Sequence, residues 1–212
     1  MSARRYVVVE GHGEVEAVHN LLTRLSQRLD DVVPWARPMR WPNLHQWDND
    51  RSGGVRAAIE FVRGKGDAAS LLVLRDEDDL CPATVAPAIS QQIREIAPPM
   101  PTSYVLLKPE YEVLFLPCLD DMAGRQLDFQ RPGLLAGTAW DGASWESRRG
   151  VKEWLSAHYD SGRVYKPTVD QLPLTRLIDL DKLAKAGVPC FGTLERAVRF
   201  LVTKQEPGAV YP

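Results

Sequence analysis

Three short apolar runs, separated by segments of helical periodicity, constrain the fold of this chain more than any other feature. They are "YVVV" at residues 6–9, "LLVL" at 71–74 and "YVLL" at 104–107. Continuous apolar runs of this length are typical of buried strands that are covered on both faces. Strands that alternate with helices need crossover connections, so we expect an α/β fold with a mostly parallel sheet flanked by helices.

Helical patterns fill the intervals between these runs. Apolar residues recur at spacings of three and four after the first strand, at Val15, Val18, Leu22, Leu25 and Leu29. They form one apolar helix stripe. A loop rich in proline and tryptophan, with a short strand, leads to a second helix that we expect to be capped near Ser52. A third helix is expected over roughly 83–96, before the break "APPMP".

The pattern changes after Lys108. The segment "PEYEVLFLPCLDDMA" fits a helix, the next twenty or so residues are irregular, and shorter helices are expected in "WESRRGVKEWLSAHY" and "TLERAVRFLVTK". We therefore divide the chain into an α/β core, residues 1–108, and a helical and irregular extension, residues 109–212, packed on that core. A chain of 212 residues is long enough for both.

Composition indicates an ordinary soluble protein, and we expect it in the cytoplasm without membrane association. No apolar run approaches the roughly 20 residues of a membrane span, and the N-terminus lacks the pattern of a signal peptide. Cys81, Cys118 and Cys190 are odd in number and far apart, so we expect reduced thiols. The formal net charge of -2 argues against a strongly basic nucleic-acid surface but leaves room for a local basic groove.

Acidic residues follow two of the expected strands. Glu10 ends the first strand with Glu14 shortly after it, and Asp76 and Asp78 follow "LLVL". Functional groups gather at the carboxyl ends of parallel strands, so these acids would meet at one edge of the sheet. Carboxylates held that close need a cation or a proton between them, and Mg²⁺ or Mn²⁺ suits such oxygen ligands. Acids at strand ends also fit simple helix capping.

Two further features have more than one interpretation. Gly11 and Gly13 fit a tight turn that brings backbone close to a phosphate, although "GHG" is not a nucleotide-binding fingerprint. The loop before the second helix holds three tryptophans and three arginines. They fit either stacking on unpaired bases or burial against the sheet edge or a partner protein. These residues are Trp35, Trp41, Trp47, Arg37, Arg40 and Arg51.

The motifs "VVVEGHGE" and "VLRDEDD" together resemble the Toprim domain, whose signature is a glutamate after the first strand and a D-x-D after a later one. The form "VEGxxE" is similar in particular to the Toprim domains of OLD-family nucleases. Beyond the core, "KPEYEVLFLPCLDD" and "YKPTVDQLPLTRLIDL" with "CFGTLERAVRFL" resemble a free-standing Toprim-like family of unknown function. That family is often encoded beside ATPase genes and is associated with anti-phage defence. The resemblance covers most of the chain.

The resemblance implies a Toprim/Rossmann-like core that cleaves DNA or RNA with Mg²⁺ or Mn²⁺. It makes Glu10 the general acid/base or a metal-linked glutamate, and it makes lysines in "RRGVKEWL" and "YKP" partners of the scissile phosphate. The chain has Leu114 and Phe115 where a tryptophan is expected nearby, which leaves the packing there open. The implied metal residues are Glu10, Glu14, Asp76, Asp78, Glu110 and Glu112, and the implied lysines are Lys152 and Lys166.

The resemblance also implies nucleic acid and a separately encoded ATPase as partners, with this chain as the effector subunit of an ATPase-coupled defence system. The expected docking surface combines tryptophans and basic residues of the extension, which are Trp140, Trp145, Trp154, Arg148, Arg149 and Lys152. Two other functions fit the residues: a non-catalytic interaction subunit, or a nucleotidyl or glycosyl transferase whose D-x-D holds a metal against a diphosphate. The oligomeric state stays open.

Overall fold

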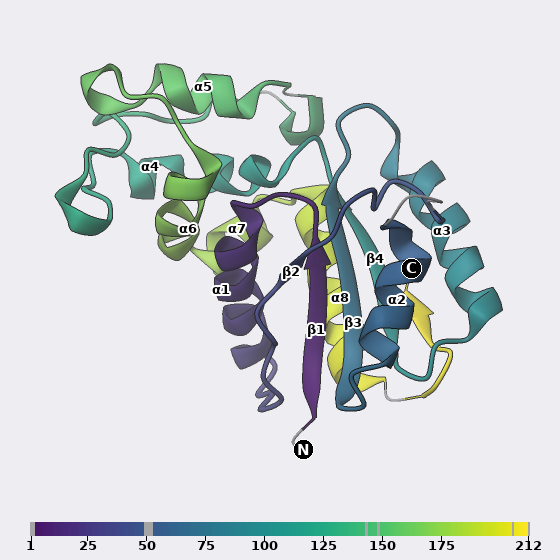
Figure 1. Cartoon of the computed structure of the whole chain (residues 1–212). Helices are drawn as coiled ribbons and strands as arrows, with labels where there is room; N and C mark the ends of the chain where they lie inside the picture. The colour runs from purple at the N-terminus through teal and green to yellow at the C-terminus, as the bar shows by residue number, and fades with distance from the viewer. Residues whose placement is uncertain (1–2, 49–52, 143, 148, 205, 212) are drawn as a thin grey trace.

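In the part of the chain that the structure describes, the fold is built around a five-stranded parallel sheet (Figure 1). The computed structural model describes residues 3–48, 53–142, 144–147, 149–204 and 206–211. The strand order is β2-β1-β3-β4-β5, and every pair is parallel. The predicted α/β class with a mostly parallel sheet is confirmed. The strands are β1 (Arg4–Val9), β2 (Met39–Arg40), β3 (Ala68–Asp76), β4 (Thr102–Leu107) and β5 (Val210–Tyr211).

Helices cover both faces of the sheet (Figure 1). One face packs against α2 (Gly54–Arg63) and α3 (Pro82–Ile96), and the other packs against α1 (Glu14–Gln27) and α8 (Pro189–Thr203). We call them the α2/α3 face and the α1/α8 face. The pleat assigns alternate strand residues to opposite faces. Residues facing α1 and α8 include Val7, Val9, Leu72 and Leu74, and those facing α2 and α3 include Tyr6, Val8, Leu71 and Val73.

The long helices form where the sequence supplies an apolar stripe and a suitable start. The buried residues of α1 include Val18, Leu21, Leu22 and Leu25, at helical spacing. Both α3 and α8 have proline at the start, where the missing N–H breaks no intrahelical hydrogen bond. The predicted periodicity of the first helix is therefore the stripe that packs against the sheet.

The extension forms a layer beyond the carboxyl ends of β1 and β3, with α4, α5 and α6 at that end of the sheet in Figure 1. The predicted helix in "PEYEVLFLPCLDDMA" is instead a 3₁₀ helix, Tyr111–Cys118, followed by one turn of α-helix. Pro117 lies within it, and proline supplies no N–H for a regular α-helical ladder. The other elements are α4 (Leu119–Met122), α5 (Val151–Ala157), α6 (Pro167–Leu177), α7 (Leu180–Lys185) and short 3₁₀ turns at Asp128–Gln130, Trp145–Ser147 and Asp160–Gly162.

The end of the chain returns to the sheet. The segment predicted as a helix in "TLERAVRFLVTK" is part of α8, which covers the sheet beside α1. β5 then pairs with β4 through Thr102 and Ser103. Residues on both sides of Lys108 consequently share one apolar core on the α1/α8 face.

The tryptophans of the loop after α1 pack inward. Trp35 is buried, and its indole N–H donates to Ser26 Oγ over 2.7 Å. The indole of Trp41 donates to the carbonyl of Gly54 over 3.0 Å, and both Trp41 and Trp47 pack partly buried against the α2/α3 core. This packing favours burial over base stacking. Arg51 and the expected cap near Ser52 lie outside the described residues.

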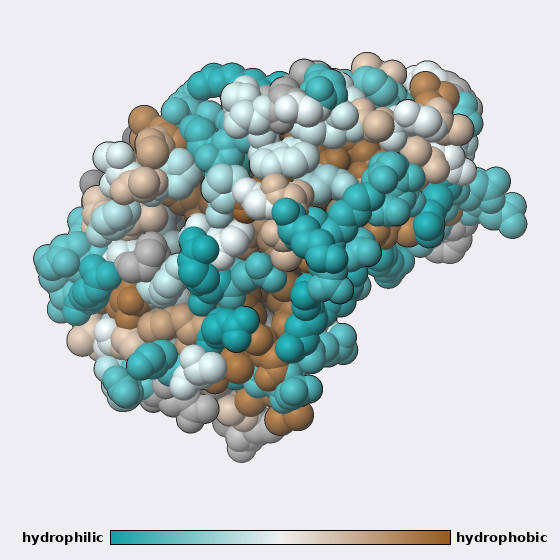
Figure 2. Space-filling model, turned by 180° about the vertical axis from the view of Figure 1, so that it is seen from behind, coloured by the Kyte–Doolittle hydropathy of each residue, from teal (hydrophilic) through white to brown (hydrophobic). Residues whose placement is uncertain are grey.

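The outer surface on the α1/α8 side is largely polar. Figure 2 shows the molecule from behind, and on this side hydrophobic residues lie in patches between hydrophilic ones. Cys118 and Cys190 are buried and Cys81 is exposed, and all three are free thiols. Within the ranges that the structure describes, none of the helices has the length and apolar character needed to cross a membrane.

Gly13 allows α1 to pack closely on α6. A Cβ added at Gly13 would lie 2.6 Å from Gln171 Oε1 and 2.7 Å from the backbone carbonyl carbon of Pro167. The φ of Gly13 is an ordinary -65°, so the lack of space and not the dihedral angle requires glycine. In the "GHG" turn this glycine therefore serves helix packing.

We expect Gly13→Ala to lower the free energy of unfolding by about 1–3 kcal/mol, because the added methyl group meets the backbone of Pro167. Gly11→Ala is the matched control. Its Cβ would meet the Glu14 carboxylate, the end of a flexible side chain, at 2.5 Å and should be tolerated better. Urea denaturation of both variants measures the difference. Equal stability of Gly13→Ala and the wild type would contradict the packing role.

Candidate active site

The strand order marks one end of the sheet as the place for a ligand. β1 lies between β2 and β3. The chain runs from β1 to β2 on one side and then crosses to β3 on the other side of β1, so the strand order reverses between β1 and β3. In open α/β sheets, ligands bind outside the carboxyl ends of the strands at such a switch point. Glu10 and Glu14 follow β1, Asp76 ends β3, and the extension lies over this end.

Three carboxylates and one lysine meet at this point, and the carboxylate of Glu14 lies near them. Lys152 Nζ lies 2.8 Å from Glu110 Oε2 and 3.5 Å from Glu112 Oε2. Asp76 Oδ2 lies 3.9 Å from the same nitrogen. The charge of Glu14 is close enough to help raise the pKa of Asp76, after the larger effect of burial. We call Glu14, Asp76, Glu110, Glu112 and Lys152 the acid–lysine cluster.

Backbone hydrogen bonds hold the cluster between the sheet and the extension. Asp76 Oδ1 accepts from the backbone N–H of Tyr111 over 2.8 Å, which fixes the start of the 3₁₀ helix against β3. Glu110 Oε1 accepts from the backbone N–H of Lys152 over 3.2 Å, at the start of α5. Glu14 accepts from the backbone N–H of Gly11 over 3.3 Å. The backbone therefore positions these three acids, through the starts of the 3₁₀ helix and α5 and through the turn before α1.

Glu112 is the most deeply buried member of the cluster, with 0% exposure. Its Oε1 accepts from the hydroxyl of Tyr165 over 2.7 Å and from Gln171 Nε2 over 3.1 Å. Among the residues that the structure describes, its Oε2 has no hydrogen-bond partner and makes one ion contact, with Lys152 Nζ at 3.5 Å. A buried carboxylate oxygen without a hydrogen bond is costly, so this oxygen calls for a proton or a further cation.

Burial and mutual repulsion raise the pKa of several cluster carboxyls. Burial raises the pKa of Glu112 to about 7. The charge of Glu110 also raises this pKa, whereas Lys152 and the hydroxyl of Tyr165 lower it. Burial, followed by the charges of Glu14 and Glu112, holds the pKa of Asp76 well above its usual range. Burial also raises the pKa of Glu14. One ammonium group therefore does not neutralise the four acids.

Protonation of Glu112 should make the protein more stable in mild acid. Its native pKa of about 7 lies above the ordinary value of 4.5, so the native state binds a proton that the unfolded state releases between these values. In chelator, the free energy of unfolding should fall as pH rises through that window, by on the order of 1–3 kcal/mol. Denaturation at pH 5 and pH 8 measures this. Glu112→Gln should flatten the dependence, and an unchanged slope in that variant would contradict the assignment.

Glu10 points away from the cluster. Val9 faces α1 and α8, so the pleat turns Glu10 toward the opposite face. Its Oε1 accepts from the backbone N–H of Leu44 over 2.8 Å and lies 3.8 Å from His45 Nδ1. Its charge still contributes to raising the pKa of Glu14, which places it near the edge of the cluster.

Two other predicted site residues also lie apart from the cluster. Asp78 is exposed, and no contact among the described residues joins its carboxylate to Asp76. Lys166 is exposed as well, and its backbone N–H donates to Asp170 at the start of α6. The structure thus brings Asp76, Glu110, Glu112 and Lys152 of the predicted set into contact. The charge of Glu14 is close enough to affect Asp76, and Glu10, Asp78 and Lys166 lie outside direct contact with the cluster.

Tyr165 and Gln171 are cluster neighbours that the sequence analysis did not single out. Both hydrogen bond to Glu112, and both are buried. The signal for Tyr165 lies in "YKP", where the aromatic residue and not the adjacent Lys166 points inward. Gln171 carries no comparable local signal, because its role depends on where α6 docks.

The cluster suits a hard divalent cation in its chemistry. Its donors are carboxylate oxygens, its charge is negative, and Glu112 Oε2 is a buried oxygen without a hydrogen bond. The ammonium of Lys152 stands among three of the acids as a cation would. No three His, Cys, Asp or Glu side chains of the described ranges are arranged to share one metal ion.

No family model, no curated protein and no solved structure matches the chain. The α/β fold therefore stands on the structure, and the resemblance to Toprim domains stands on the sequence motifs.

Proposed function

We propose that this chain is a divalent-metal-dependent nuclease that hydrolyses phosphodiester bonds of DNA or RNA, with the acid–lysine cluster as its active site. The observation that carries the proposal is the meeting of Asp76, Glu110 and Glu112 around Lys152, at the carboxyl end of β3. The resemblance of the strand-end motifs to OLD-family Toprim nucleases points to the same chemistry.

The cluster residues have distinct roles in this proposal. Glu14, Asp76, Glu110 and Glu112 would hold Mg²⁺ or Mn²⁺. When bound, such an ion polarises a phosphoryl oxygen and lowers the pKa of a bound water. Lys152 offsets the negative charge that develops on the phosphate. Without an ion, burial raises the pKa of Glu112 to about 7, so binding of the cation would displace a proton from this carboxyl near neutral pH.

Cleavage assays on single- and double-stranded DNA and RNA test the proposal. With Mn²⁺ or Mg²⁺, at least one substrate should be cut, and EDTA should stop the reaction. The Glu110→Gln variant should cleave much more slowly than the wild type, because Glu110 Oε2 makes the shortest contact with Lys152 in the cluster, at 2.8 Å. Undiminished cleavage by a rigorously purified Glu110→Gln protein would assign the activity to another site or to a contaminant.

We further propose that the nuclease works with a separately encoded ATPase. The net charge of -2 gives little general attraction to a polyanion, so another surface is needed to hold substrate.

The expected docking surface for the ATPase includes three tryptophans of the extension. The half-buried rings of Trp140 and Trp145 stack with centroids 5.9 Å apart, and Trp154 packs edge-on against Trp140 at 5.7 Å. Arg148, part of the expected docking surface, lies outside the described residues. The resemblance implies an ATPase gene beside the gene for this chain. Co-expression with the product of such a gene and size-exclusion chromatography test this proposal: separate elution, with strong cleavage by the isolated chain, would overturn it.

A second candidate function is a non-catalytic interaction subunit. The observation that favours it is Lys152 itself, which already supplies a cation to the acids and joins α5 to β3 and the 3₁₀ helix. In that case the cluster is an ion-pair network that holds the extension on the sheet. Metal binding separates the two functions, because the nuclease requires it and the structural network does not.

A further inference from the structure

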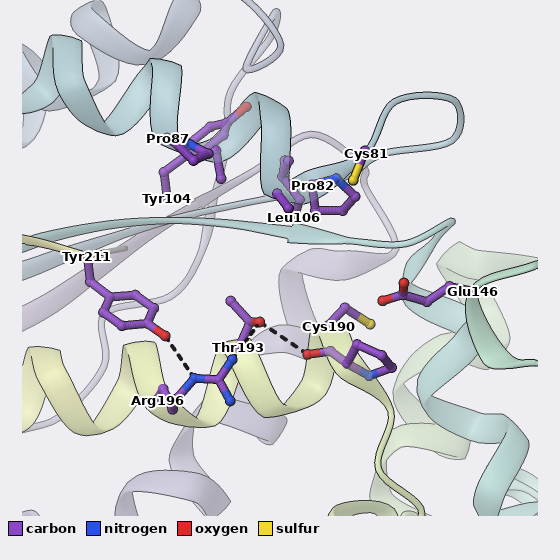
Figure 3. Close-up of a pocket in the computed structure, with 13 residues that line it drawn as sticks. Cys81, Pro82, Pro87, Tyr104, Leu106, Glu146, Cys190, Thr193, Arg196 and Tyr211 are labelled. Atoms are coloured by element: carbon purple, nitrogen blue, oxygen red, sulfur yellow. Dashed lines mark hydrogen bonds between the residues drawn. The ribbon is translucent and has the colours of Figure 1, made fainter.

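A pocket of about 290 Å³ lies between α3 and α8 (Figure 3). Glu146 is the one carboxylate of the described residues that lines it, and no residue of the acid–lysine cluster does. The pocket is therefore separate from the candidate active site. The properties of the cluster depend instead on the buried side chains that contact its acids, and Glu112 has two such neighbours, Tyr165 and Gln171.

The two carboxylate oxygens of Glu112 have different surroundings. Oε1 accepts from the hydroxyl of Tyr165 over 2.7 Å and from Nε2 of Gln171 over 3.1 Å. A carboxylate offers about two lone-pair sites on each oxygen, so these two donors use the full capacity of Oε1. Oε2 is buried and, within the described ranges, accepts no hydrogen bond. Oε2 is consequently the oxygen of Glu112 that is left for a cation.

The free oxygen of Glu112 faces the same point as two other acids. It lies 3.5 Å from Lys152 Nζ, which is also 2.8 Å from Glu110 Oε2 and 3.9 Å from Asp76 Oδ2. The ammonium group thus marks the place toward which all three acids direct an oxygen. A cation bound there would meet Oε2 of Glu112 and not the fully hydrogen-bonded Oε1.

Both donors to Oε1 are themselves held in place. Tyr165 is 4% exposed, and its backbone N–H donates to Ser156 Oγ of α5 over 3.1 Å. Gln171 is 2% exposed in α6, where its carbonyl accepts from Thr175 Oγ1 over 2.7 Å. The carboxylate of Glu112 cannot rotate without breaking two hydrogen bonds to buried donors, and leaving such donors unpaired is costly.

We propose that Tyr165 and Gln171 are positioning residues for the cation of the acid–lysine cluster, because by binding Oε1 they keep Oε2 of Glu112 as the ligand atom. The inference rests on the proposed function, in which the acids of the cluster hold Mg²⁺ or Mn²⁺. Neither residue contacts the cation, and each acts through Glu112. In protein metal sites, loss of the hydrogen bonds that orient a ligand typically weakens metal affinity or activity by about 10–100-fold.

Tyr165→Phe tests the proposal, because it removes the hydroxyl that binds Oε1 and keeps the ring. We expect it to weaken Mn²⁺ binding by about 10–100-fold, measured by electron paramagnetic resonance of the free ion. Tyr159→Phe is the matched control. The Tyr159 hydroxyl is buried without a hydrogen-bond partner among the described residues, and its ring centroid lies 6.2 Å from that of Tyr165. This control should leave the Mn²⁺ affinity unchanged.

A second variant covers the other donor. Gln171→Met fills a similar volume without the amide that donates to Glu112, so it should also weaken Mn²⁺ binding. It keeps the proposal testable if Tyr165→Phe does not fold. Thermal melting in chelator shows for each variant whether the fold is retained.

The Glu112→Gln background separates positioning from a general structural effect. If Tyr165 acts through the Glu112 carboxylate, Tyr165→Phe should lower the Mn²⁺ affinity of the wild type but should not lower that of Glu112→Gln further. An equal loss in both backgrounds would overturn the proposal. Wild-type Mn²⁺ affinity in both Tyr165→Phe and Gln171→Met would also overturn it while leaving the metal site in place. Absence of Mn²⁺ binding by the wild type would instead overturn the metal site and the proposed function together with this inference.

Discussion

Asp76→Asn should lower metal-dependent hydrolysis by about 100-fold or more while the fold stays intact. Asparagine has the size of aspartate and keeps an oxygen that accepts from the Tyr111 N–H, a contact of 2.8 Å in the structure. It removes the negative charge that a divalent ion requires. Burial and neighbouring acids already raise the pKa of Asp76, so the neutral side chain should leave the protein at least as stable. Initial cleavage rates in saturating Mn²⁺ and thermal melting in chelator measure the two effects.

Two variants serve as references for this result. Asp79→Asn removes an exposed acid close in sequence, ion-paired with Arg149 at 2.8 Å, and should leave the rate within about twofold. Glu10→Gln should cause a smaller loss than Asp76→Asn, because Glu10 contacts Leu44 and His45 on the opposite face. A larger loss from Glu10→Gln than from Asp76→Asn would move the catalytic centre to that face.

Lys152→Met should destabilise the protein in chelator and at the same time increase its affinity for Mn²⁺. Methionine fills a similar volume but leaves Asp76, Glu110 and Glu112 without their ammonium partner. Removing one partner of a buried ion pair costs about 3–5 kcal/mol, and the 36% exposure of the Lys152 side chain lowers our expectation to about 1–3 kcal/mol. The loss should be greatest above pH 7, where Glu112 is ionised. Saturating Mn²⁺ should restore part of the stability.

The same variant separates charge compensation from catalysis. If Lys152 also neutralises the scissile phosphate, Lys152→Met should bind Mn²⁺ more tightly and still cleave at least about tenfold more slowly. Lys185→Met, at an exposed lysine of α7, is the matched control and should change neither quantity. Lys152→Met with wild-type stability and wild-type Mn²⁺ affinity would show that the ammonium does not balance the acids.

Most of the sheet follows from the sequence because its strands are long, apolar and separated by periodic helices. β1, β3 and β4 lie at the predicted runs, and α1, α2 and α3 lie between them. β5 has only two residues, Val210 and Tyr211, too few for any periodicity to be recognised. The position of α8 on the sheet was not predictable either, since an apolar stripe shows that a helix packs but not where it packs.

The candidate site shows a similar division. That acids gather at one end of the sheet follows from the strand ends. Which face each acid takes depends on the pleat, and this separates Glu10, which directly follows β1, from Asp76, which ends β3. The exposed loop after β3 carries Asp78 away from Asp76. The resemblance implies Glu112 as a site residue, and its physical signal is a charged residue within a run that is buried from Tyr111 to Leu116.

Direct titration of the chain with Mn²⁺, followed by electron paramagnetic resonance of the free ion, tests most directly whether the acid–lysine cluster is a metal site. We expect saturable binding by the wild type, loss of that binding in Asp76→Asn, and binding at least about tenfold tighter in Lys152→Met. The cluster would not be a metal site if the wild type bound no Mn²⁺ at millimolar concentration, or if Asp76→Asn bound it as the wild type does.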